Sequence, residues 1–563
     1  MKAAHLGRVL RTVAHLRPTQ IVSQLRYLFN EELRAGAPLE QTPERSIERA
    51  FVPFLDAPAH ARYDGALGFE LLRRKHRFRD HVDWDFEGHG PLWLFHLHQF
   101  DWARGKSVSA SARAAFVEDW IEECTHGAGW SPHPISLRIL SWGKLRLTPG
   151  ALLQSPEESV RMDNSLAQQA QTLSERLETR LQANHLFSNV LSCVFAGLLY
   201  RGARADAWLA LESILRDEIE LQVLADGAHI ERSPMYHALL LENVLDLLNV
   251  ARAADARAPR ILVECLESTA AKMLGAHRIW THPDGEIALF GDSAFDIAHP
   301  PDVLEAYADA LGVNVRESVV PKALGNAGVF RMESGDLSLI ATASSPMPSY
   351  QPGHAHCDAL SFELSVGTQR VVTDTGVSEY IPGPIRDISR ATTSHATVEL
   401  NHADQSEVWS AHRVGGRAKV VVHEFNGDML HASCTSWASR DVCHHRTFRI
   451  EDGALTIEDR IEGDALPARF ALPLAPGLDP KLKHRRTNAP KTGELGVQEQ
   501  VYQLSVRLGR KVSLTVDLPA GVDWSIERTA YFPRFGSYVD RACLVGKSDG
   551  FRSGIWVLNV ERA

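Results

Sequence analysis

The sequence predicts an α+β protein in which a helical N-terminal domain precedes an antiparallel β domain. Its 563 residues exceed what one hydrophobic core normally supports, which favours two or more domains. From about residue 100 to 310, apolar residues recur at helical spacing, as in SLAQQAQTLSERLETRLQANHLFSNVLSCVFAGLLY. After Pro321, short alternating runs such as GALTIEDRIEG follow one another, bounded by Gly, Asp, Asn and Pro. Because helices grouped before strands disfavour an alternating α/β sheet, we expect a helical domain over residues 1–320 and a β domain over residues 321–563.

The composition is that of a globular protein without the features of a nucleic-acid binder. Hydrophobic residues make up 44% of the chain and charged residues 23%. The formal net charge is −10, and no run of Lys and Arg is long enough to follow a nucleic-acid backbone. These features argue against nucleic acid as the main partner. An acidic polysaccharide is still a possible partner, because binding it requires only a locally basic cleft.

The cysteines and the N-terminus indicate neither a disulfide framework nor a leader. The seven cysteines are odd in number and lack CxxC spacing, so reduced thiols are expected. In MKAAHLGRVLRTVAHLRPTQIVSQLRYLF, His and Arg interrupt every apolar run, which predicts an amphipathic helix rather than a signal peptide. No segment has the roughly 18 uninterrupted apolar residues of a membrane span. As written, the chain is expected in the cytoplasm, or in the periplasm or outside the cell if a leader has been removed.

Four segments place polar groups in apolar surroundings, and the first contains Arg138. It begins as WSPHPISLR at Trp130 and continues as ILSW, so a guanidinium enters an otherwise apolar helix start. A planar guanidinium can bind a carboxylate through two hydrogen bonds, which makes Arg138 a candidate for substrate binding. The alternative is an Arg that reaches the surface or pairs with an acidic neighbour.

The second segment, QANHLFSN, introduces amides and an imidazole into a helix otherwise made of Leu, Val, Phe and Ala. Polar groups cost free energy on such a helix face unless they are hydrogen-bonded. Asn184 and His185 therefore have two interpretations. They either lean over a cleft and bind a substrate carboxylate, or they are core residues that hydrogen-bond to backbone carbonyls.

The third segment, DGAHIERSPMYH, starts with a turn signal and ends by opening a helix. Ser233 followed by Pro234 suits an N-cap with Pro at the first helical position. Tyr236 is then expected in the first turn, where unsatisfied backbone N–H groups favour a phenolate. A catalytic Tyr is one interpretation, and a packing residue whose hydroxyl meets water is the other.

The fourth segment, HAHCD, is the richest in potential metal ligands. If it forms a strand, His354, His356 and Asp358 share one face. Imidazole and carboxylate groups drawn from separate segments suit zinc, whereas an HxH pair in a strand is commonly structural. Four further polar residues follow this segment: Asp374, Arg386, Arg390 and His395.

Taken in order, these segments resemble the heparinase II/III family. The resemblance runs along nearly the whole chain, through GPLWLFHLHQFDW, WSPHPISLRILSW, ANHLFSN, DGAHIERSPMYH, HPDGEIALFGD, GHAHCDALSFEL and RATTSHATV. It implies an incomplete (α/α) toroid followed by an antiparallel β-sandwich, with a cleft between them. It also implies a lyase that cleaves a uronic-acid-containing polysaccharide, a glycosaminoglycan or a related bacterial polysaccharide, by β-elimination.

The resemblance also implies roles for individual residues. Elimination requires that the uronate carboxylate be neutralised, the C5 proton removed and the departing O4 protonated. By resemblance, Asn184 and His185 help to neutralise the carboxylate. Tyr236 acts as base, acid or both, with His354 as the partner base. The substrate-binding residues implied by the same motifs are Trp130, Arg138, His237, Arg386 and Arg390.

The family's metal site matches His356, Asp374 and His395, which implies a structural divalent ion, zinc by its ligands, and no organic cofactor. The two arginines before His395 have two interpretations. Arg386 and Arg390 either meet sulfate or carboxylate groups of a substrate, or pair with Asp374 or Asp387. The chain departs from some relatives after the Asn-His pair, where LFSN lacks an acidic residue, and this leaves the preference for sulfated substrates open.

Two other functions compete with elimination. One is a non-catalytic or processing role in building or trimming a bacterial surface polysaccharide, because a family resemblance does not prove turnover. The other is glycoside hydrolysis, which needs two carboxylic acids about 5 to 10 Å apart, for which Glu231 and Asp358 are the evident candidates. A close approach of Tyr236 to His354 across the cleft would favour the lyase.

Overall fold

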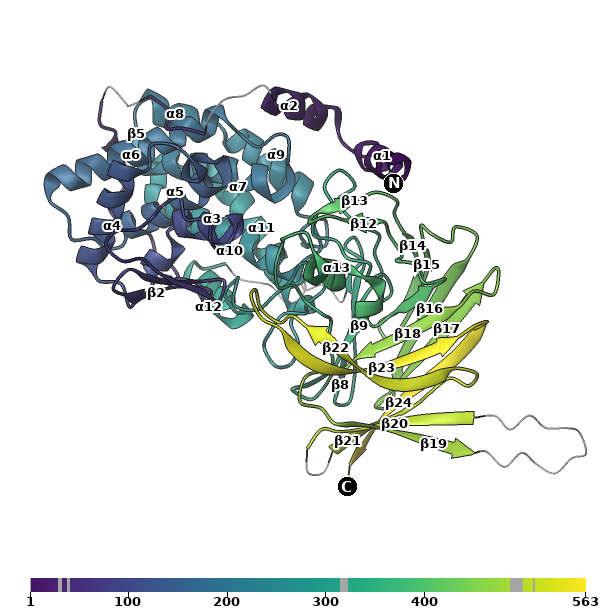
Figure 1. The fold of residues 1–563 in the computed structure, drawn as a ribbon. Helices are drawn as coiled ribbons and strands as arrows, with labels where there is room; N and C mark the ends of the chain where they lie inside the picture. The colour runs from purple at the N-terminus through teal and green to yellow at the C-terminus, as the bar shows by residue number, and fades with distance from the viewer. Residues whose placement is uncertain are drawn as a thin grey trace, which may run out of the picture.

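In the computed structural model, helices fill the N-terminal part of the chain and strands fill the C-terminal part, side by side (Figure 1). The structure describes residues 2–28, 33–37, 41–313, 323–486, 500–509 and 512–562. The predicted order of a helical and an antiparallel β domain is therefore confirmed. The predicted boundary at residue 320 lies outside the described residues, so its position stays a prediction.

Helix α7 (Ala183–Leu199) lies at the centre of the helical domain, in contact with α5, α6, α8, α9 and α10. All of its residues are buried except Asn184 and His185. Its buried Leu, Val and Phe side chains join one continuous apolar core with the surrounding helices. The surrounding helices are α3 (Pro91–Gln99), α4 (Ala110–Glu123), α5 (Pro132–Leu147), α6 (Pro156–Glu175), α8 (Ala203–Leu209), α9 (Glu212–Gln222), α10 (Pro234–Ala254), α11 (Arg260–Trp280) and α12 (Pro301–Ala310).

Short strands also occur within the helical domain, which the helical periodicity did not predict. They form a three-stranded sheet and a two-stranded pair. Their bounds are β1 (Glu44–Arg45), β2 (Ala61–Gly65), β3 (Gly68–Leu71), β4 (Arg74–Arg77) and β5 (Tyr200–Arg201). Phe69 of β3 is buried against the helical core, so this small sheet adds to the same domain.

The N-terminal residues form helices, as predicted, but these helices lie against the β domain. Helix α1 (Lys2–Val13) lies beside β12 and β13, and α2 (Pro18–Leu28) follows it towards the helical domain (Figure 1). Arg11 Nε donates a hydrogen bond of 2.8 Å to the Glu407 carboxylate. Gln20 Nε2 donates to the Tyr350 carbonyl at 3.3 Å. The first helices thus tie the two domains together.

The β domain contains a large antiparallel sheet packed on two smaller ones. The large sheet has the order β14-β15-β16-β17-β24-β21-β20-β19, and the smaller sheets have the orders β11-β18-β23-β22 and β10-β9-β8-β7-β6. A single apolar core contains side chains from all three sheets, which makes this domain a sandwich.

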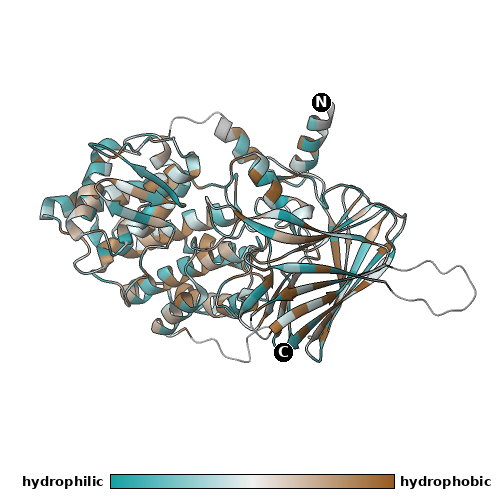
Figure 2. Cartoon of the chain, turned by 60° about the horizontal axis from the view of Figure 1, so that its bottom comes forward, coloured by the Kyte–Doolittle hydropathy of each residue, from teal (hydrophilic) through white to brown (hydrophobic). Residues whose placement is uncertain are grey.

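Along the sandwich strands, buried and exposed side chains alternate. In β17, Leu455, Ile457 and Ile461 face the core while Glu458 and Arg460 face outwards. Figure 2 shows the alternation as hydrophobic and hydrophilic bands along these strands. The burial of one apolar face selects this register, because a shift of one residue would move every apolar side chain from the core face to the solvent face.

The elements of this domain have the following bounds: β6 (Ala323–Leu324), β7 (Val329–Ser334), β8 (Leu337–Thr342), β9 (Phe362–Val366), β10 (Gln369–Val372), α13 (Pro384–Arg390), β11 (Val398–Leu400), β12 (Val408–Trp409), β13 (Arg413–Val414), β14 (Lys419–Phe425), β15 (Met429–Thr435), β16 (Cys443–Glu451), β17 (Ala454–Glu462), β18 (Ala468–Pro473), β19 (Pro480–Arg486), β20 (Gln500–Arg507), β21 (Val512–Asp517), β22 (Asp523–Tyr531), β23 (Val539–Ser548) and β24 (Ser553–Arg562).

Apolar contacts join the two domains. Trp280 at the end of α11 and Phe290 after it share a buried cluster with Val329 and Ile340 of the β domain. The first turns of α7 and α10 lie opposite the loop between β8 and β9, where Asn184 and Tyr236 approach His354. All seven cysteines are free. Among the described residues, no helix is both long and apolar enough to cross a membrane.

Candidate active site between the two domains

Three polar side chains from separate elements meet where the two domains face each other. Asn184 lies in the first turn of α7, Tyr236 in the first turn of α10, and His354 in the loop between β8 and β9. The rings of Tyr236 and His354 stack with their centroids 3.9 Å apart and their planes 28° apart. Asn184 Nδ2 lies 3.5 Å from His354 Nε2. The structure therefore brings together the residues to which the resemblance gives catalytic roles.

Residues with strained backbone lie at the start of both helices. Gln182 and Ala183 have φ values of 59° and 48°, and Arg232, just before α10, has a φ of 58°. This left-handed region is costly for residues with a Cβ atom, and such outliers cluster at functional sites. Ser233 then caps α10 as predicted, since its Oγ accepts a hydrogen bond from the Tyr236 N–H at 3.2 Å.

Asp292 orients His354 by a hydrogen bond to its Nδ1 atom. The His354 Nδ1 and His356 Nε2 atoms each lie 2.8 Å from one oxygen of the Asp292 carboxylate. Arg386 binds the same carboxylate through both terminal nitrogens, with its Nη2 at 2.8 Å. Burial raises the pKa of Asp292, but Arg386 and the two imidazoles more than offset this and hold the pKa well below its usual range. Asp292 is therefore an ionised, fully hydrogen-bonded carboxylate.

Asp292 is the last residue of the segment HPDGEIALFGD, and its role was not predicted from the sequence. The sequence feature that could have indicated this role is the Gly291-Asp292 pair at the end of the segment. Gly291 has a φ of 56°, and a Cβ there would lie 2.8 Å from the His354 carbonyl oxygen. Gly291 thus permits the backbone approach in which the Asp292 N–H donates to the His354 carbonyl at 3.0 Å.

The expected strand at HAHCD is wrong. His354 and His356 lie in an irregular loop, and they are related by their shared partner Asp292 rather than by a strand face. The carboxylate of Asp358 accepts a hydrogen bond from the Gly291 N–H at 3.3 Å. Long-range hydrogen bonds, rather than strand periodicity, orient these side chains.

The Tyr236 hydroxyl is a neutral phenol in this environment. It lies 3.1 Å from the Tyr380 hydroxyl, which sequence reasoning did not single out. Burial raises the pKa of Tyr236, and Asp292 and Glu231 raise it further, whereas the Tyr380 hydrogen bond lowers it only in part. The expectation that the helix start favours a phenolate is therefore wrong, because Ser233 already satisfies the local N–H and the phenol is desolvated.

The start of α7 presents a second polar group. His185 Nδ1 lies 3.1 Å from the Glu178 carboxylate, and the ring of His133 lies 4.7 Å from the His185 ring. Burial lowers the pKa of His185, but Glu178 more than offsets it, so the pKa is raised. The Asn184 backbone N–H and its side-chain Nδ2 each donate to Glu231 at 3.1 Å. This arrangement fixes the amide at the edge of the cleft.

A cavity with about 1060 Å³ of empty space, open to solvent, lies beside these groups. Its polar lining residues include Asn184, Tyr236 and Tyr380, together with the cations Arg104 and Lys144. His354 lines a smaller hollow of about 390 Å³ with Glu231 and Asp358. Those two acids do not line the larger cavity. The carboxylates that do line it, Asp101 and Glu242, lie within ion-pair distance of Arg104 and Lys144 respectively.

The predicted substrate-binding residues Trp130, Arg138 and His237 lie in the core of the helical domain rather than on the cleft, and this corrects their assignment. Arg138 Nε donates to Gln169 Oε1 at 2.9 Å, and its Nη2 donates to the Gly129 carbonyl at 2.8 Å. Arg138 does not reach the surface, and among the described residues it pairs with no acidic side chain. The Trp130 Nε1 donates to a backbone carbonyl at 2.8 Å, and the His237 Nε2 lies 2.9 Å from another.

Arg386 and Arg390 are also buried, and neither lines the larger cavity. Arg386 pairs with Asp292 instead of Asp374, Asp387 or a substrate anion. Arg390 donates to backbone carbonyls, including that of Ala355 at 3.2 Å. Both guanidiniums therefore support the loop that carries His354.

His356, Asp374 and His395 converge inside the β domain and fit a divalent cation. One ligand atom from each lies within 4.8 Å of the others, and all three residues are buried. The His356 Nδ1 and His395 Nε2 atoms have no hydrogen-bond partner within the described parts of the chain, so each can donate a lone pair to an ion. Burial lowers the pKa of His356 to about 4, which keeps its imidazole neutral.

The fold and the site define a two-domain protein in which a helical toroid and a β-sandwich build one polar cluster at their junction. The family model described as heparinase II/III N-terminus matches residues 97–311, and the model described as heparinase II/III-like, C-terminal, matches residues 318–548. The chain therefore belongs to the heparinase II/III family.

Two curated relatives share sequence with much of the chain. A heparin-sulfate lyase of Pedobacter heparinus is 23% identical over 384 residues, which are 58% of this chain and 56% of the relative. FtsZ-localized protein C of Caulobacter vibrioides is 24% identical over 408 residues, which are 68% of this chain and 66% of the relative. The chain thus spans between about half and two thirds of the length of the curated relatives it matches.

Solved structures share the fold. A crystal structure of heparinase III is similar with a TM-score of 0.64 and 17% identity, covering 86% of this chain and 80% of that one. A heparan sulfate lyase HepC mutant from Pedobacter heparinus is similar with a TM-score of 0.59 and 18% identity, covering 90% and 82%. At these identities the similarity shows the arrangement of toroid and sandwich.

Proposed function

We propose that this chain is a polysaccharide lyase that cleaves a uronic-acid-containing polysaccharide by β-elimination. The observation that carries the proposal is the stacking of Tyr236 on His354 at 3.9 Å, with Asn184 beside them, from elements of two domains. A proton donor, a proton acceptor and an amide at one edge of a cleft are what elimination beside a carboxylate requires. The similarity to a heparin-sulfate lyase supports the same reaction class.

In the proposed reaction, the amide of Asn184 and the imidazole of His185 offset the charge of the uronate carboxylate, which makes the C5 proton more acidic. The ionised Asp292 holds His354 Nδ1, so that the Nε2 lone pair accepts the C5 proton. The electron pair of that C–H bond forms the C4–C5 double bond as the C4–O4 bond breaks. The neutral phenol of Tyr236 protonates the departing O4, and this role agrees with its raised pKa.

We further propose that His356, Asp374 and His395 hold a structural zinc ion, because two imidazoles and a carboxylate suit zinc. The ion would supply ligand bonds that fix the sandwich wall beneath the cleft. His356 shares Asp292 with His354, so the position of one imidazole depends on that of the other.

The direct test is incubation of the purified chain with separate uronate polysaccharides: heparan sulfate, heparin, hyaluronan, chondroitin and bacterial uronate polymers. A lyase creates an unsaturated uronate at the new end, which absorbs in the near ultraviolet. We expect new absorbance with at least one polymer and mass spectra of products without added water. Fragments that contain added water and lack this absorbance would identify a hydrolase and overturn the proposal.

The second candidate is a non-catalytic or processing role in the assembly of a surface polysaccharide. The observation that favours this role is the similarity to FtsZ-localized protein C, which covers a larger share of this chain than the heparin-sulfate lyase does. Binding of a uronate polymer without cleavage, by a protein whose Tyr236→Phe variant binds equally well, would favour this role.

A further inference from the structure

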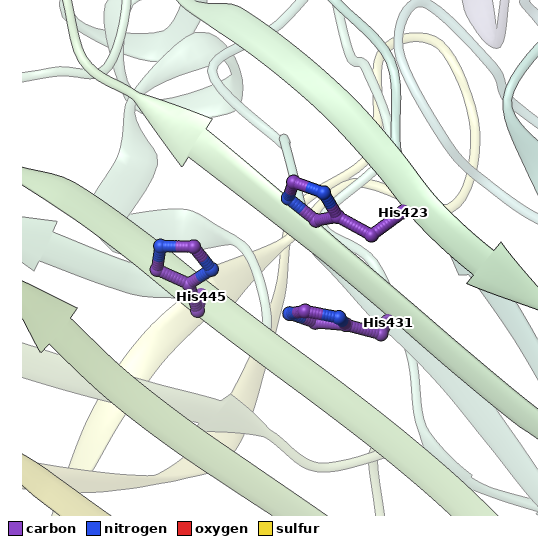
Figure 3. Close-up of side chains that lie close together, drawn as sticks. All are labelled: His423, His431 and His445. Carbon is purple, nitrogen blue, oxygen red and sulfur yellow. The ribbon is translucent and has the colours of Figure 1, made fainter.

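Three histidines gather on the outer face of the large sheet, away from the candidate active site and from the interior metal site. His423, His431 and His445 come from the neighbouring strands β14, β15 and β16, and their rings surround one small space (Figure 3). One ring nitrogen of each lies within 4.8 Å of the others. The ring centroids of His423 and His431 are 4.6 Å apart, and each lies 5.7 Å from that of His445.

The strand register creates this cluster. His431 lies between the buried Leu430 and Ala432, so alternation turns its side chain away from the core. His445 is paired with Ser433, two residues from His431 on the same face. On β14 the register shifts between Val422 and Glu424, which leaves His423 as the extra residue of a β-bulge. Bulges redirect side chains, and here the bulge brings a third imidazole to the other two.

The chemistry of the three rings suits a metal ion. His423 Nε2 lies 2.8 Å from Ser433 Oγ, a partner that orients the ring and leaves its other nitrogen available. The Nδ1 of His445 is buried and, within the described residues, has no hydrogen-bond partner. Partial burial, together with the neighbouring imidazoles and Arg460, lowers the pKa of His431 and His445. The neutral imidazole is the form that coordinates metals, and a lowered pKa favours that form.

We propose that His423, His431 and His445 form a second metal site, which binds a late first-row divalent cation of the zinc class. Three neutral imidazoles suit Zn²⁺, Ni²⁺ or Cu²⁺, whereas Mg²⁺ and Ca²⁺ need oxygen ligands. With three imidazoles in place, water supplies the remaining ligand of the ion.

The ion has a structural consequence at this place. Strand β14 is the first in the order of the large sheet, and it is interrupted by the bulge at His423. Edge strands are held by one neighbour only, and bulges weaken that pairing locally. An ion shared by the three histidines joins the edge strand to β15 and also to β16. The site therefore serves as a clamp on the edge of the sandwich.

The test compares Zn²⁺ stoichiometry between the metal-stripped wild-type chain and a variant carrying His431→Gln and His445→Gln. Equilibrium dialysis at neutral pH with elemental analysis gives the count. The matched control is His484→Gln, which removes an exposed histidine from β19 at the opposite edge of the same sheet. We expect the double variant to bind one equivalent fewer than the wild type and the control. Equal stoichiometry in all three proteins would overturn the proposal.

A second measurement needs no variant. Diethyl pyrocarbonate modifies accessible neutral imidazoles, and mass spectrometry locates the modified residues. We expect Zn²⁺ to protect His423, His431 and His445 from modification, and Mg²⁺ to leave their modification unchanged. Equal modification of the three residues with and without Zn²⁺ would also overturn the proposal, whether or not the double variant folds.

Discussion

At the scale of single residues, one buried carboxylate, that of Asp292, connects the groups that orient His354. Asp292 accepts hydrogen bonds from His354, His356 and Arg386, and it is completely buried. A buried charge is tolerable only when it is paired in this way. By holding Nδ1 of His354, Asp292 leaves Nε2 as the ring nitrogen that is available to act as the proposed base.

The first prediction concerns the hydroxyl of Tyr236. The Tyr236→Phe variant keeps the ring that stacks on His354 and loses only the proposed proton donor, so it should fold normally. On a confirmed substrate, we expect the rate of elimination to fall by at least about 10²-fold, as for other positioned acids. The measurement is the initial rate of near-ultraviolet absorbance, with circular dichroism to verify the fold. A folded variant with nearly wild-type turnover would remove Tyr236 from the mechanism.

The second prediction concerns pH and the Glu178–His185 pair. Burial raises the pKa of Glu178, but His185, His133 and Arg180 more than offset it and lower the pKa from 4.5 to about 2. A depressed carboxyl pKa stabilises the folded state above the unfolded value, and the benefit is lost as pH falls through the folded value. The shift corresponds to roughly 3 kcal/mol.

The variant that tests this linkage is Glu178→Gln, which keeps the size of the side chain and removes its charge. Its deficit in the free energy of unfolding, relative to the wild type, should be largest above about pH 4.5 and shrink as pH falls towards 2. Urea unfolding at a series of pH values measures it. A deficit that does not change over this range would show that Glu178 contributes no such linkage.

At the scale of elements, one helix start connects the groups of the site. Ser233 Oγ accepts from the Tyr236 N–H and lies 2.7 Å from the Asp292 carbonyl oxygen, to which it donates. The N-cap of α10 is therefore also the attachment of the loop that carries Asp292. Because both ends of this link are buried, a shift of α10 would move the phenol and the imidazole anchor together.

The third prediction concerns helix α1, which lies outside the helical core and packs on the β domain. Glu407, whose side chain is 15% exposed, accepts hydrogen bonds from Arg8 and Arg11 of this helix. In a Glu407→Ala variant we expect trypsin to cleave after Arg8 and Arg11 faster than in the wild type, while the global unfolding midpoint stays the same. The control is Glu451→Ala, an exposed acidic residue at the end of β16. Equal cleavage in all three proteins would mean that other contacts hold α1.

At the scale of the whole molecule, two separate apolar cores are joined by a smaller apolar contact. The helical core and the sandwich core are each continuous, and the clusters around Trp280 and Met235 lie between them. The site is assembled only when this contact is made, since Asn184 and Tyr236 belong to one side and His354 to the other. Domain docking is thus part of the formation of the site.

The fourth prediction concerns the interior ion. Removal of metal by a chelator, or the change His395→Ala, should lower the thermal midpoint of the β domain, because the buried ring nitrogens lose the ion that satisfies them. Zn²⁺ should restore the midpoint of the chelated wild type but not that of the variant. Elemental analysis of purified active protein that finds no bound metal, with a melt unchanged by chelation, would contradict the interior site.

Much of the architecture could be predicted from the sequence alone. The change of period around residue 320 predicted helices followed by strands, because each element buries one face and the spacing of apolar residues records that face. The N-cap at Ser233 and the amphipathic helix at the N-terminus depend on neighbouring residues only. The short strands β2, β3 and β4 were missed, since RKHR and ARYDG lack a run of β-forming residues.

The sequence by itself thus determined the order of the domains, the helix starts and the set of polar motifs, because these depend on residues close along the chain. Only the tertiary structure decided which polar groups face the cleft. Arg138 and Arg386 proved to be buried structural residues, and Asp292 proved to anchor His354 from 62 residues away. The physical reason is that burial and hydrogen-bond partners come from distant segments, and no local pattern records which distant carboxylate or carbonyl a side chain meets.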